Sequence, residues 1–337
     1  MPAAPAHLPV GGPLRNSRPL SETSAAVIRS AVPAQYDRLS LCRDWQRAWP
    51  RRIQERIAGS TGVDIPRRGK TNVSFAFDHA IIAVGALEPA IEHFRALGFS
   101  AFYGGQHADG KTHNGLVVFE DGGYLELLAP VDVDFMASLD TVDLSSFLDF
   151  VAKGDGWAGY ALQVEDIDAA AQAMRDRQLS VTGPTANGRT RPDGTELAWR
   201  TIAIDNTRTP FFITDETPRV LRVPDDADKV THANGVTGVD SMIVAVQNLG
   251  KSSDYYRAML GVEPRNGPPI ADAGTASFTL AGFTLTLAAP SVQDSPLYDY
   301  LKQRGEVPYE IHLRTNQLQP AGLLDVERTH EARIVLV

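Results

Sequence analysis

Apolar and polar residues follow the same order of spacings in two separate stretches of the chain. Residues 78–130 and residues 240–290 align from an initial Asp to a final Ala-Pro with one small gap. Each stretch begins with a short apolar run, continues with apolar residues spaced as on an amphipathic helix, and then reaches a glycine, Gly98 or Gly261, suited to ending that helix. Further apolar runs separated by turn residues follow. The pattern predicts a repeated β-α-β-β-β module.

Two fainter copies of the module complete the pattern. Residues 157–214 contain a strand, a helix and three further strands, whereas residues 307–337 keep two strands and lack most of the helix and hairpin between them. A single module leaves one apolar sheet face exposed, so it needs a partner module. We therefore expect a first domain of two modules at 73–217, a linker at 218–235, and a second, degenerate domain at 236–337.

The first 72 residues differ from the rest in composition and charge. They carry 12 Lys and Arg against 5 Asp and Glu, a charge of +7, whereas the remaining residues carry 20 against 36, a charge of −16. Residues 1–33 are rich in proline, which predicts disorder, and residues 34–57 have a weak helical pattern. Three interpretations of this basic leader stay open: an extension without function, an organellar targeting peptide, and a docking element.

The composition also limits the classes of function. An acidic body argues against nucleic-acid binding, which depends on neutralising phosphates. Cys42 is the only cysteine, which excludes an internal disulfide and a cysteine-based zinc site. No apolar run reaches the roughly 18 residues that a membrane helix needs. We expect a cytoplasmic protein with neither nucleic-acid nor membrane partners, and import into an organelle remains the alternative.

Three segments together resemble a known family. DHAIIAV at 78–84, GGQHADGKTHNGL at 104–116 and YLELLAP at 124–130 are similar to the glyoxalase-like domains of the vicinal oxygen chelate superfamily, which also includes bleomycin-resistance proteins and extradiol dioxygenases. The resemblance covers about residues 76–215, and residues 236–337 resemble a degenerate second copy. It implies an α+β fold in which tandem βαβββ modules form curved sheets around a cleft. It also implies a monomer or homodimer that binds a small-molecule substrate.

The resemblance places possible metal ligands on the first and fourth strands of each module. In the first module these are His79 and Glu126, types that suit divalent zinc, manganese, nickel or iron. Strand alternation is expected to place His79 on one face with Phe77 and Ile81. The equivalent positions in the other modules are Gly159 and Phe212, Ser241 and Thr286, and Glu310 and Val335.

A catalytic metal usually has three protein ligands, and no two consecutive modules supply them. One hypothesis is that module one pairs with module four, which would bring Glu310 beside His79 and Glu126. The alternative is that His79 and Glu126 form a polar pair without a metal.

Other candidates surround this pair. His113, and less so His107, is a candidate third ligand or acid–base group, because histidine titrates near neutral pH; a solvated loop is the alternative. Asn114 is a candidate for orienting a substrate through its amide. Aromatic residues are candidates for the substrate-binding wall, with core packing as the alternative for those of module two: Tyr124, Trp157, Tyr160, Trp199 and Phe212.

Two classes of function follow from the resemblance. The first is a metal-dependent isomerase, lyase or dioxygenase acting on a small oxygen-rich molecule, with His113 and Glu126 as catalytic groups. The second is a metal-free protein that binds or sequesters a small molecule, similar to bleomycin-resistance proteins. The degenerate second half favours the second class, because Ser241, Thr286 and Val335 form no evident catalytic set.

Overall fold

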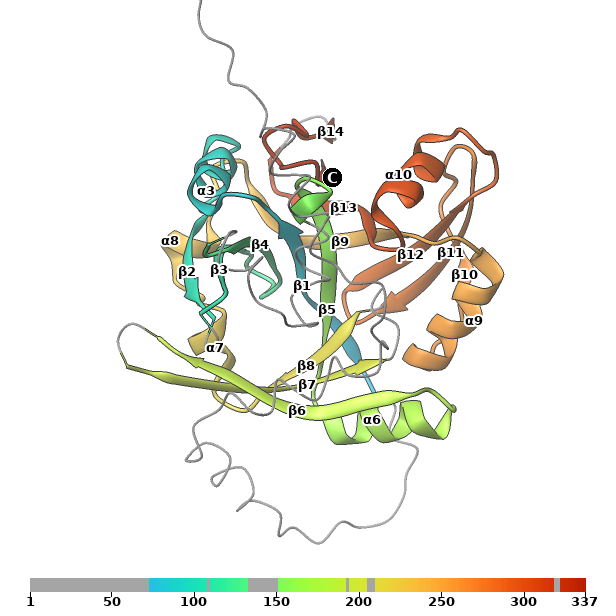
Figure 1. Ribbon diagram of the computed structural model, residues 1–337, viewed down its shortest axis with the longest axis horizontal. Coiled ribbons are helices and arrows are strands. Elements are labelled where there is room, and N and C mark those ends of the chain that lie inside the picture. The colour runs from blue at the N-terminus through green and yellow to red at the C-terminus, as the bar shows by residue number, and fades with distance from the viewer. Residues whose placement is uncertain (1–72, 108–109, 133–150, 192–193, 205–209, 318–321) are drawn as a thin grey trace, which may run out of the picture. The chain divides into compact units, whose positions relative to one another are not determined.

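The computed structural model describes residues 73–107, 110–132, 151–191, 194–204, 210–317 and 322–337 (Figure 1). The basic leader, with the disorder and the helix predicted for it, lies outside the described residues. None of the described helices combines the length and the apolar character needed to cross a membrane.

Modules one and two form one eight-stranded sheet. Its strand order is β2-β3-β4-β1-β5-β8-β7-β6. The first strands of the two modules, β1 and β5, pair antiparallel at its centre, and each also pairs parallel with the last strand of its own module. The strands are β1 Phe75–Ala83, β2 Phe102–Gln106, β3 Thr112–Val118, β4 Tyr124–Pro130, β5 Gly156–Val164, β6 Val181–Thr190, β7 Glu196–Ile204 and β8 Phe211–Asp215.

Modules three and four form a second, seven-stranded sheet in the order β10-β11-β12-β9-β13-β15-β14. In the fourth module, no helix is described between its first and last strands. The hypothesis that module one pairs with module four is wrong, because β1 pairs with β5 and β9 pairs with β13. The strands are β9 Val236–Ala245, β10 Arg265–Asn266, β11 Ala273–Leu280, β12 Phe283–Pro290, β13 Pro308–Thr315, β14 Gly322–Leu323 and β15 Arg333–Leu336. The predicted α+β fold of tandem modules is confirmed.

One helix follows the first strand in each of modules one to three: α3 Leu87–Ala96, α6 Ile167–Asp176 and α9 Leu249–Leu260. The side chains of Asp166 and Asn248 cap α6 and α9 by accepting hydrogen bonds from backbone N–H groups of the first turn. Gly261 ends α9 in the left-handed conformation, with φ of 67°, which a residue with a Cβ adopts less readily. The helix predicted from the first module's pattern likewise ends just before Gly98, whose φ is 90°.

A β-bulge in β1 sets the direction of the side chains that matter most. The pairing of β1 with β5 shifts register between Phe77 and His79, so Asp78 is the extra residue. The side chains in the main core are Phe75 and Phe77 before the shift and Ala80 and Ile82 after it. Asp78 and His79 therefore share the opposite face, and the predicted shared face of His79 and Phe77 is wrong.

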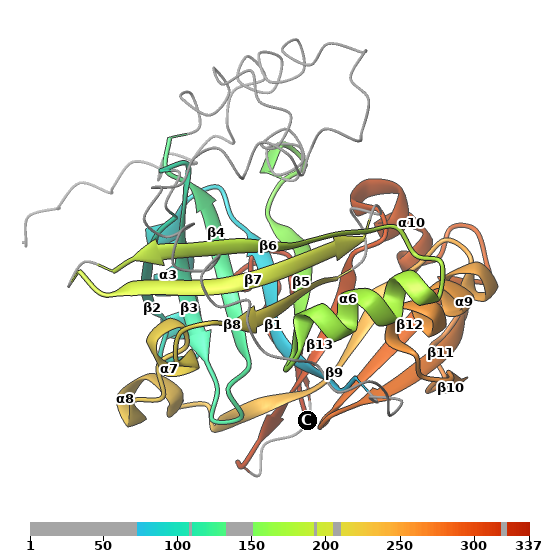
Figure 2. The same ribbon diagram turned by 90° about the horizontal axis from the view of Figure 1, so that it is seen from below.

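The two sheets meet in one apolar core. The rings of Phe77 on β1 and Phe283 on β12 lie 5.1 Å apart, and one continuous cluster of buried residues includes strands of both sheets. The hydroxyl groups of Tyr160 on β5 and Tyr256 on α9 form a buried hydrogen bond of 3.0 Å. The two sheets are thus joined by both apolar packing and a polar contact. Figures 1 and 2 show how their strands are arranged.

The segment predicted as a linker packs on the first sheet. It contains α7 Arg219–Arg222 and α8 Ala227–Val230. Val223 belongs to a small buried cluster with Leu116, Val118 and Tyr124 on β3 and β4. This segment covers part of the same sheet face that carries His79.

The hydrogen bond between the two tyrosines predicts a non-additive effect on stability. Tyr160→Phe leaves the buried hydroxyl of Tyr256 without its partner, which is expected to lower the free energy of unfolding by about 1–3 kcal/mol. The double variant with Tyr256→Phe should lose less than the sum of the two single losses. Urea denaturation of the four proteins measures this difference, and strictly additive losses would contradict a coupling between the hydroxyls.

Candidate functional site

The eight-stranded sheet curls until its two edges approach each other. Strands β2 and β6 stand at opposite edges of the sheet, yet the guanidinium of Arg189 on β6 donates a hydrogen bond to the backbone oxygen of Gly104 on β2. Figure 2 shows the long β6–β7 hairpin extending in this direction. The face inside this curl, called the inner face below, carries Asp78, His79 and Glu126.

His79 is the most constrained of these side chains. It is only 4% exposed. Its ring stacks on Tyr124 at 4.6 Å between centroids and meets Phe211 edge-on at 5.5 Å. Nδ1 lies 2.7 Å from the Asp78 carboxylate, and Nε2 lies 3.6 Å from the Glu126 carboxylate. Because ionised Asp78 can only accept, Nδ1 carries a proton, and Nε2 is the ring atom directed towards Glu126.

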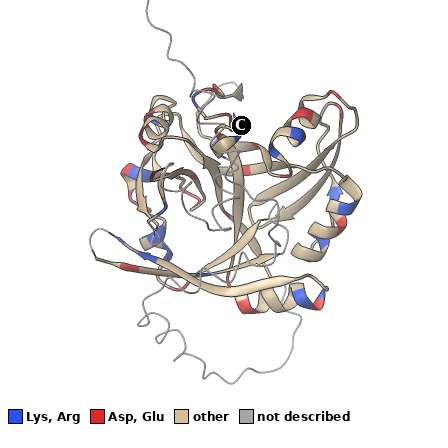
Figure 3. Ribbon diagram, in the orientation of Figure 1, with Lys and Arg blue, Asp and Glu red and all other residues tan. Residues whose placement is uncertain are grey.

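Asp78 is fully buried and is held as a carboxylate by two arginines. Arg222 donates to both of its oxygens at 3.0 Å, and Arg219 also donates to it. Burial alone would raise the pKa of Asp78, but Arg222, the hydrogen bond from His79 and Arg219 outweigh burial and hold the pKa well below its usual range. Asp215 on β8 binds the same two arginines. Charged side chains otherwise gather mainly on helices and loops (Figure 3), so this buried network is distinctive.

Glu126 connects His79 to the segment at the end of β2. It is 7% exposed and accepts a hydrogen bond of 2.7 Å from the Asn114 amide. Nε2 of His107 lies 3.7 Å from the same carboxylate, while Nδ1 of His107 lies 2.6 Å from the Thr112 hydroxyl. The buried carbonyl oxygen of Asn114 has no hydrogen-bond partner among the described residues. Glu126 is thus flanked by two imidazoles, with an unused acceptor beside it.

The donor types match a divalent metal site, although the distances are slightly long. Two imidazole nitrogens and a carboxylate are a common ligand set. Two ligands of one ion lie about 3.0–3.4 Å apart when each bond is near 2.1 Å, whereas His79 and His107 lie 3.6 and 3.7 Å from Glu126. Accordingly, no three His, Cys, Asp or Glu side chains in the described part of the chain form a ready-made metal site.

The structure does not bring His113 to this cluster. On β3, Val117 faces the main core, and a Cβ on Gly115 would meet Ile91 of α3, so the odd-numbered positions face the helix. His113 shares that outer face, and Asn114 faces inward. Burial, opposed by Glu88 of α3, lowers the pKa of His113. The histidine that approaches Glu126 is His107.

Most of the predicted aromatic wall lies in the core instead of the inner face. A second register shift, between Ile81 and Ile82, makes Ala158 the extra residue of β5. As a result, Trp157 and Tyr160 both belong to the main core, as does Phe212. The inner face instead receives Phe211, which contacts His79.

Tyr124 and Trp199 lie on the inner face. Tyr124 lies directly against His79, as expected for a residue of the substrate wall. Trp199 alternates with the core residues Ile202 and Ile204, which places it on the inner face of β7, half-buried.

Glu310 lies in the other sheet and has partners there. Its carboxylate accepts hydrogen bonds from His312 at 2.9 Å and from Arg333 at 2.9 and 3.1 Å, and His312 also contacts the Ser241 hydroxyl at 3.0 Å. Burial raises the pKa of Glu310, but His312 and Arg333 outweigh it and lower the pKa overall. Glu310 therefore takes part in a separate polar cluster and does not complete the set of His79 and Glu126.

Several residues of the site were not predicted from the sequence. Asp78 precedes His79 in the DH pair, and a carboxylate next to a candidate histidine was a usable signal. Arg219 and Arg222 come from a segment interpreted as a linker, and Arg189 reaches the site across the whole sheet. Sequence spacing gives no indication of such long-range contacts.

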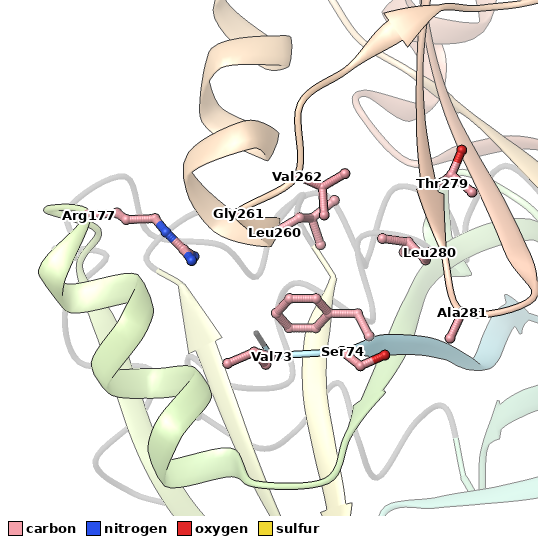
Figure 4. A pocket seen from close by; sticks show the side chains of 10 residues that line it. Val73, Ser74, Arg177, Leu260, Gly261, Val262, Thr279, Leu280 and Ala281 are labelled. Atoms are coloured by element: carbon pink, nitrogen blue, oxygen red, sulfur yellow. The ribbon is translucent and has the colours of Figure 1, made fainter. Parts of the chain in front are cut away.

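A cavity of about 360 Å³ lies away from this cluster (Figure 4). It is bounded by the start of β1, by Arg177 after α6, and by Leu260 and Gly261 at the end of α9. The guanidinium of Arg177 donates to the backbone oxygen of Ala258. None of the lining residues belongs to the His79 cluster, so this cavity is a separate feature of the junction between the sheets.

Comparisons with known proteins agree with this architecture. The model of a family described as a glyoxalase-like domain matches residues 77–253. A search of curated proteins finds no match to the chain. A hypothetical protein from Staphylococcus aureus has a similar structure, with a TM-score of 0.59 and 16% identity over 78% of this chain and 99% of that one.

Two enzymes are similar at lower TM-scores. A mutant 4-hydroxymandelate synthase from Streptomyces coelicolor gives 0.47, with 12% identity over 73% of this chain and 72% of that one. Methylmalonyl-CoA epimerase from Mycobacterium tuberculosis gives 0.28, with 18% identity over 32% of this chain and 91% of that one. Nothing further follows from these two similarities, and the Staphylococcus aureus structure, at 16% identity, supports the fold alone.

The lowered pKa of Asp78 predicts how stability depends on pH. Its stabilising effect is present above the unfolded-state pKa of about 4 and is lost as pH falls through the lower folded-state pKa. Asp78→Asn, which leaves Arg222 short of a buried counter-charge, is expected to cost about 3–5 kcal/mol at pH 7. Its free energy of unfolding should then fall less steeply than that of the wild type between about pH 5 and pH 2.

Denaturant titrations at several pH values measure these slopes. Asp254→Asn is a suitable control, because its pair with Arg257 on α9 is exposed and should contribute less than about 1 kcal/mol. Equal slopes for the wild type and Asp78→Asn would contradict the role assigned to Asp78.

Proposed function

Because the chain belongs to the glyoxalase-like domain family, whose model matches residues 77–253, we propose that it is an enzyme acting on a small oxygen-rich molecule. The proposed site is the inner face of the eight-stranded sheet. His79, His107 and Glu126 would hold a divalent metal there, and the reaction would be a proton transfer next to a carbonyl group, as in an isomerase or lyase.

The contact between Asp78 and His79 carries this proposal. Histidines that bind metals usually donate their second ring N–H to a carboxylate or carbonyl, which fixes the tautomer and raises ligand basicity. Asp78 provides that acceptor at 2.7 Å. Arg222 and Arg219 keep Asp78 ionised, so Nε2 of His79 stays directed at Glu126.

Asp78 would also orient His79 if this histidine acted as a base without a metal. The metal site is therefore supported additionally by the second imidazole, that of His107. His107 faces the other oxygen of Glu126, and its Nδ1 lies 2.6 Å from the hydroxyl of Thr112, which can donate or accept a hydrogen bond. The two Nε2 atoms therefore face one carboxylate from two sides. This supports a shared ligand set more than it supports a simple pair.

The remaining residues of the inner face suit a substrate with several oxygens. Arg189 is half-buried, and burial lowers its pKa although Tyr124 and Glu126 favour its charged form. The Asn114 carbonyl oxygen is free, in the described residues, to accept a hydrogen bond from a substrate hydroxyl. Phe211 and Tyr124 exclude water from the sides of His79.

When bound, a divalent ion would supply Lewis-acid stabilisation of negative charge on substrate oxygens. Glu126 is the carboxylate placed to accept a proton from a substrate carbon, with Asn114 holding one of its oxygens. Asp78 accepts a hydrogen bond from Nδ1 of His79 and so holds the ring with Nε2 directed at Glu126.

A metal-free binding protein is the second candidate. It is favoured by the hydrogen bond from Asn114 to Glu126, which already occupies part of the carboxylate. It is also favoured by the spacing of 3.6 and 3.7 Å, longer than that of ligands on one ion. In this case the same face would hold a small molecule without reaction.

Metal analysis distinguishes the two candidates. We expect the purified chain, after reconstitution, to hold one divalent ion in the cleft, and His79→Ala and His107→Ala each to weaken it at least tenfold. Removing one of three protein ligands leaves the ion with an incomplete set. Elemental analysis and titration calorimetry measure the loss.

Matched controls are available on other faces. His113→Ala removes a histidine from the outer face of β3, and Glu310→Ala removes the carboxylate once expected as a ligand; both should keep the cleft ion. If the wild type binds no ion that depends on His79 or His107, the metal-dependent function is wrong and the binding protein is favoured.

A further inference from the structure

A second group of titratable side chains lies on the other side of the first module. His93 belongs to α3, which packs on the core face of β3 and β4. Asp155 immediately precedes β5, and His330 belongs to the turn before β15. The group joins three segments that are distant in sequence, and it shares no residue with the inner-face cluster.

The hydrogen bonds in this group define where its lone pairs point. The Asp155 carboxylate lies 2.6 Å from Nδ1 of His330 and also accepts a hydrogen bond of 2.9 Å from the backbone of Gly85. Nδ1 of His330 is therefore the protonated nitrogen, which leaves a lone pair on Nε2. That Nε2 lies 3.1 Å from Nδ1 of His93.

The lone pairs of two ring nitrogens this close repel each other unless a proton or a metal ion lies between them. A proton removes this repulsion by forming a hydrogen bond, and a metal ion removes it by accepting both lone pairs. The distance of 3.1 Å falls within the spacing of about 3.0–3.4 Å that two ligands of one ion adopt. Asp155 behind His330 is again the carboxylate support typical of a metal-binding histidine.

The turn that carries His330 holds the imidazole in a fixed position. His330 and Glu331 have φ of 55° and 59°, in the left-handed region that residues with a Cβ rarely adopt. Thr329 is fully buried and donates its hydroxyl to the backbone oxygen of Ala332 at 2.6 Å. Backbone strain maintained by such packing is concentrated at functional sites.

We propose that His93 and His330 bind a transition-metal ion that prefers imidazole, such as Zn²⁺, at this outer position. His93 is exposed, so the ion has access from solvent, and water completes its coordination. With two protein ligands the site binds more weakly than a three-ligand site. Bound metal ties the last turn of module four to the helix of module one and thereby stabilises the contact between the two halves.

Zinc titration of the full chain without a histidine tag tests this site. After chelator treatment and dialysis, calorimetry with ZnSO₄ should detect one ion in the wild type that His93→Gln and His330→Asn each bind at least tenfold more weakly. Asn tolerates the left-handed conformation, so His330→Asn preserves the turn. The Tm of the wild type should also rise with zinc more than that of either variant, because the ion binds the folded state.

His113→Gln is the matched control, because it changes another histidine of the same module and should bind zinc as the wild type does. His107→Ala should keep the outer ion whatever happens at the cleft, which separates this site from the proposed catalytic one. If His93→Gln and His330→Asn bind as many ions as the wild type, with unchanged affinity, then only a proton joins the two rings and the outer site is refuted.

Discussion

A buried carboxylate, Asp78, is the constraint on which the candidate site depends. Removing an ionised group from water costs several kcal/mol even in a relaxed protein environment, unless charges and hydrogen bonds compensate. Arg222, only 6% exposed, provides that compensation together with Arg219. Both arginines come from α7, so the segment after the first domain must pack on the sheet before Asp78 can be stably buried. The fold of this segment and the orientation of His79 are therefore linked.

The bulge in β1 explains why the carboxylate of Asp78 lies on the inner face. In a regular strand, Asp78 and His79 would face opposite sides, and the imidazole of His79 would share the core face of Phe77. The extra residue places both on the inner face, in contact with each other. A small local irregularity thus creates the pair of groups that the proposed chemistry uses.

The sequence predicted the modules, their order and the ends of the helices, because period and capping residues are local properties. Gly98 and Gly261 follow their helices as these signals suggested. Strand faces were less predictable, because a bulge changes the side on which every later residue lies. Trp157 and Tyr160, on either side of the extra residue Ala158, were expected in a cleft although they pack in the core. Phe212 was expected where Phe211 is found. Register shifts of this kind depend on pairing between strands, which the composition of one strand does not reveal.

The second sheet repeats the backbone of the first without repeating its chemistry. Ser241 occupies the position of His79, and Thr286 that of Glu126, in the same register. Even the bulge recurs, at Asp240, where β9 shifts against β13. Asp240, however, is exposed and so needs no arginine partner.

The inner face of the second sheet is occupied in part by the chain itself. Leu297 and Leu301 of α10 (Pro296–Arg304) pack on Ile243, Ala245 and Ala288. With that face partly covered, Ser241 and Thr286 in place of His79 and Glu126, and Glu310 bound by His312 and Arg333, the second sheet does not repeat the His79 cluster. The duplication therefore accounts for the architecture, and the buried Asp78 accounts for why the candidate catalytic site lies on the first sheet.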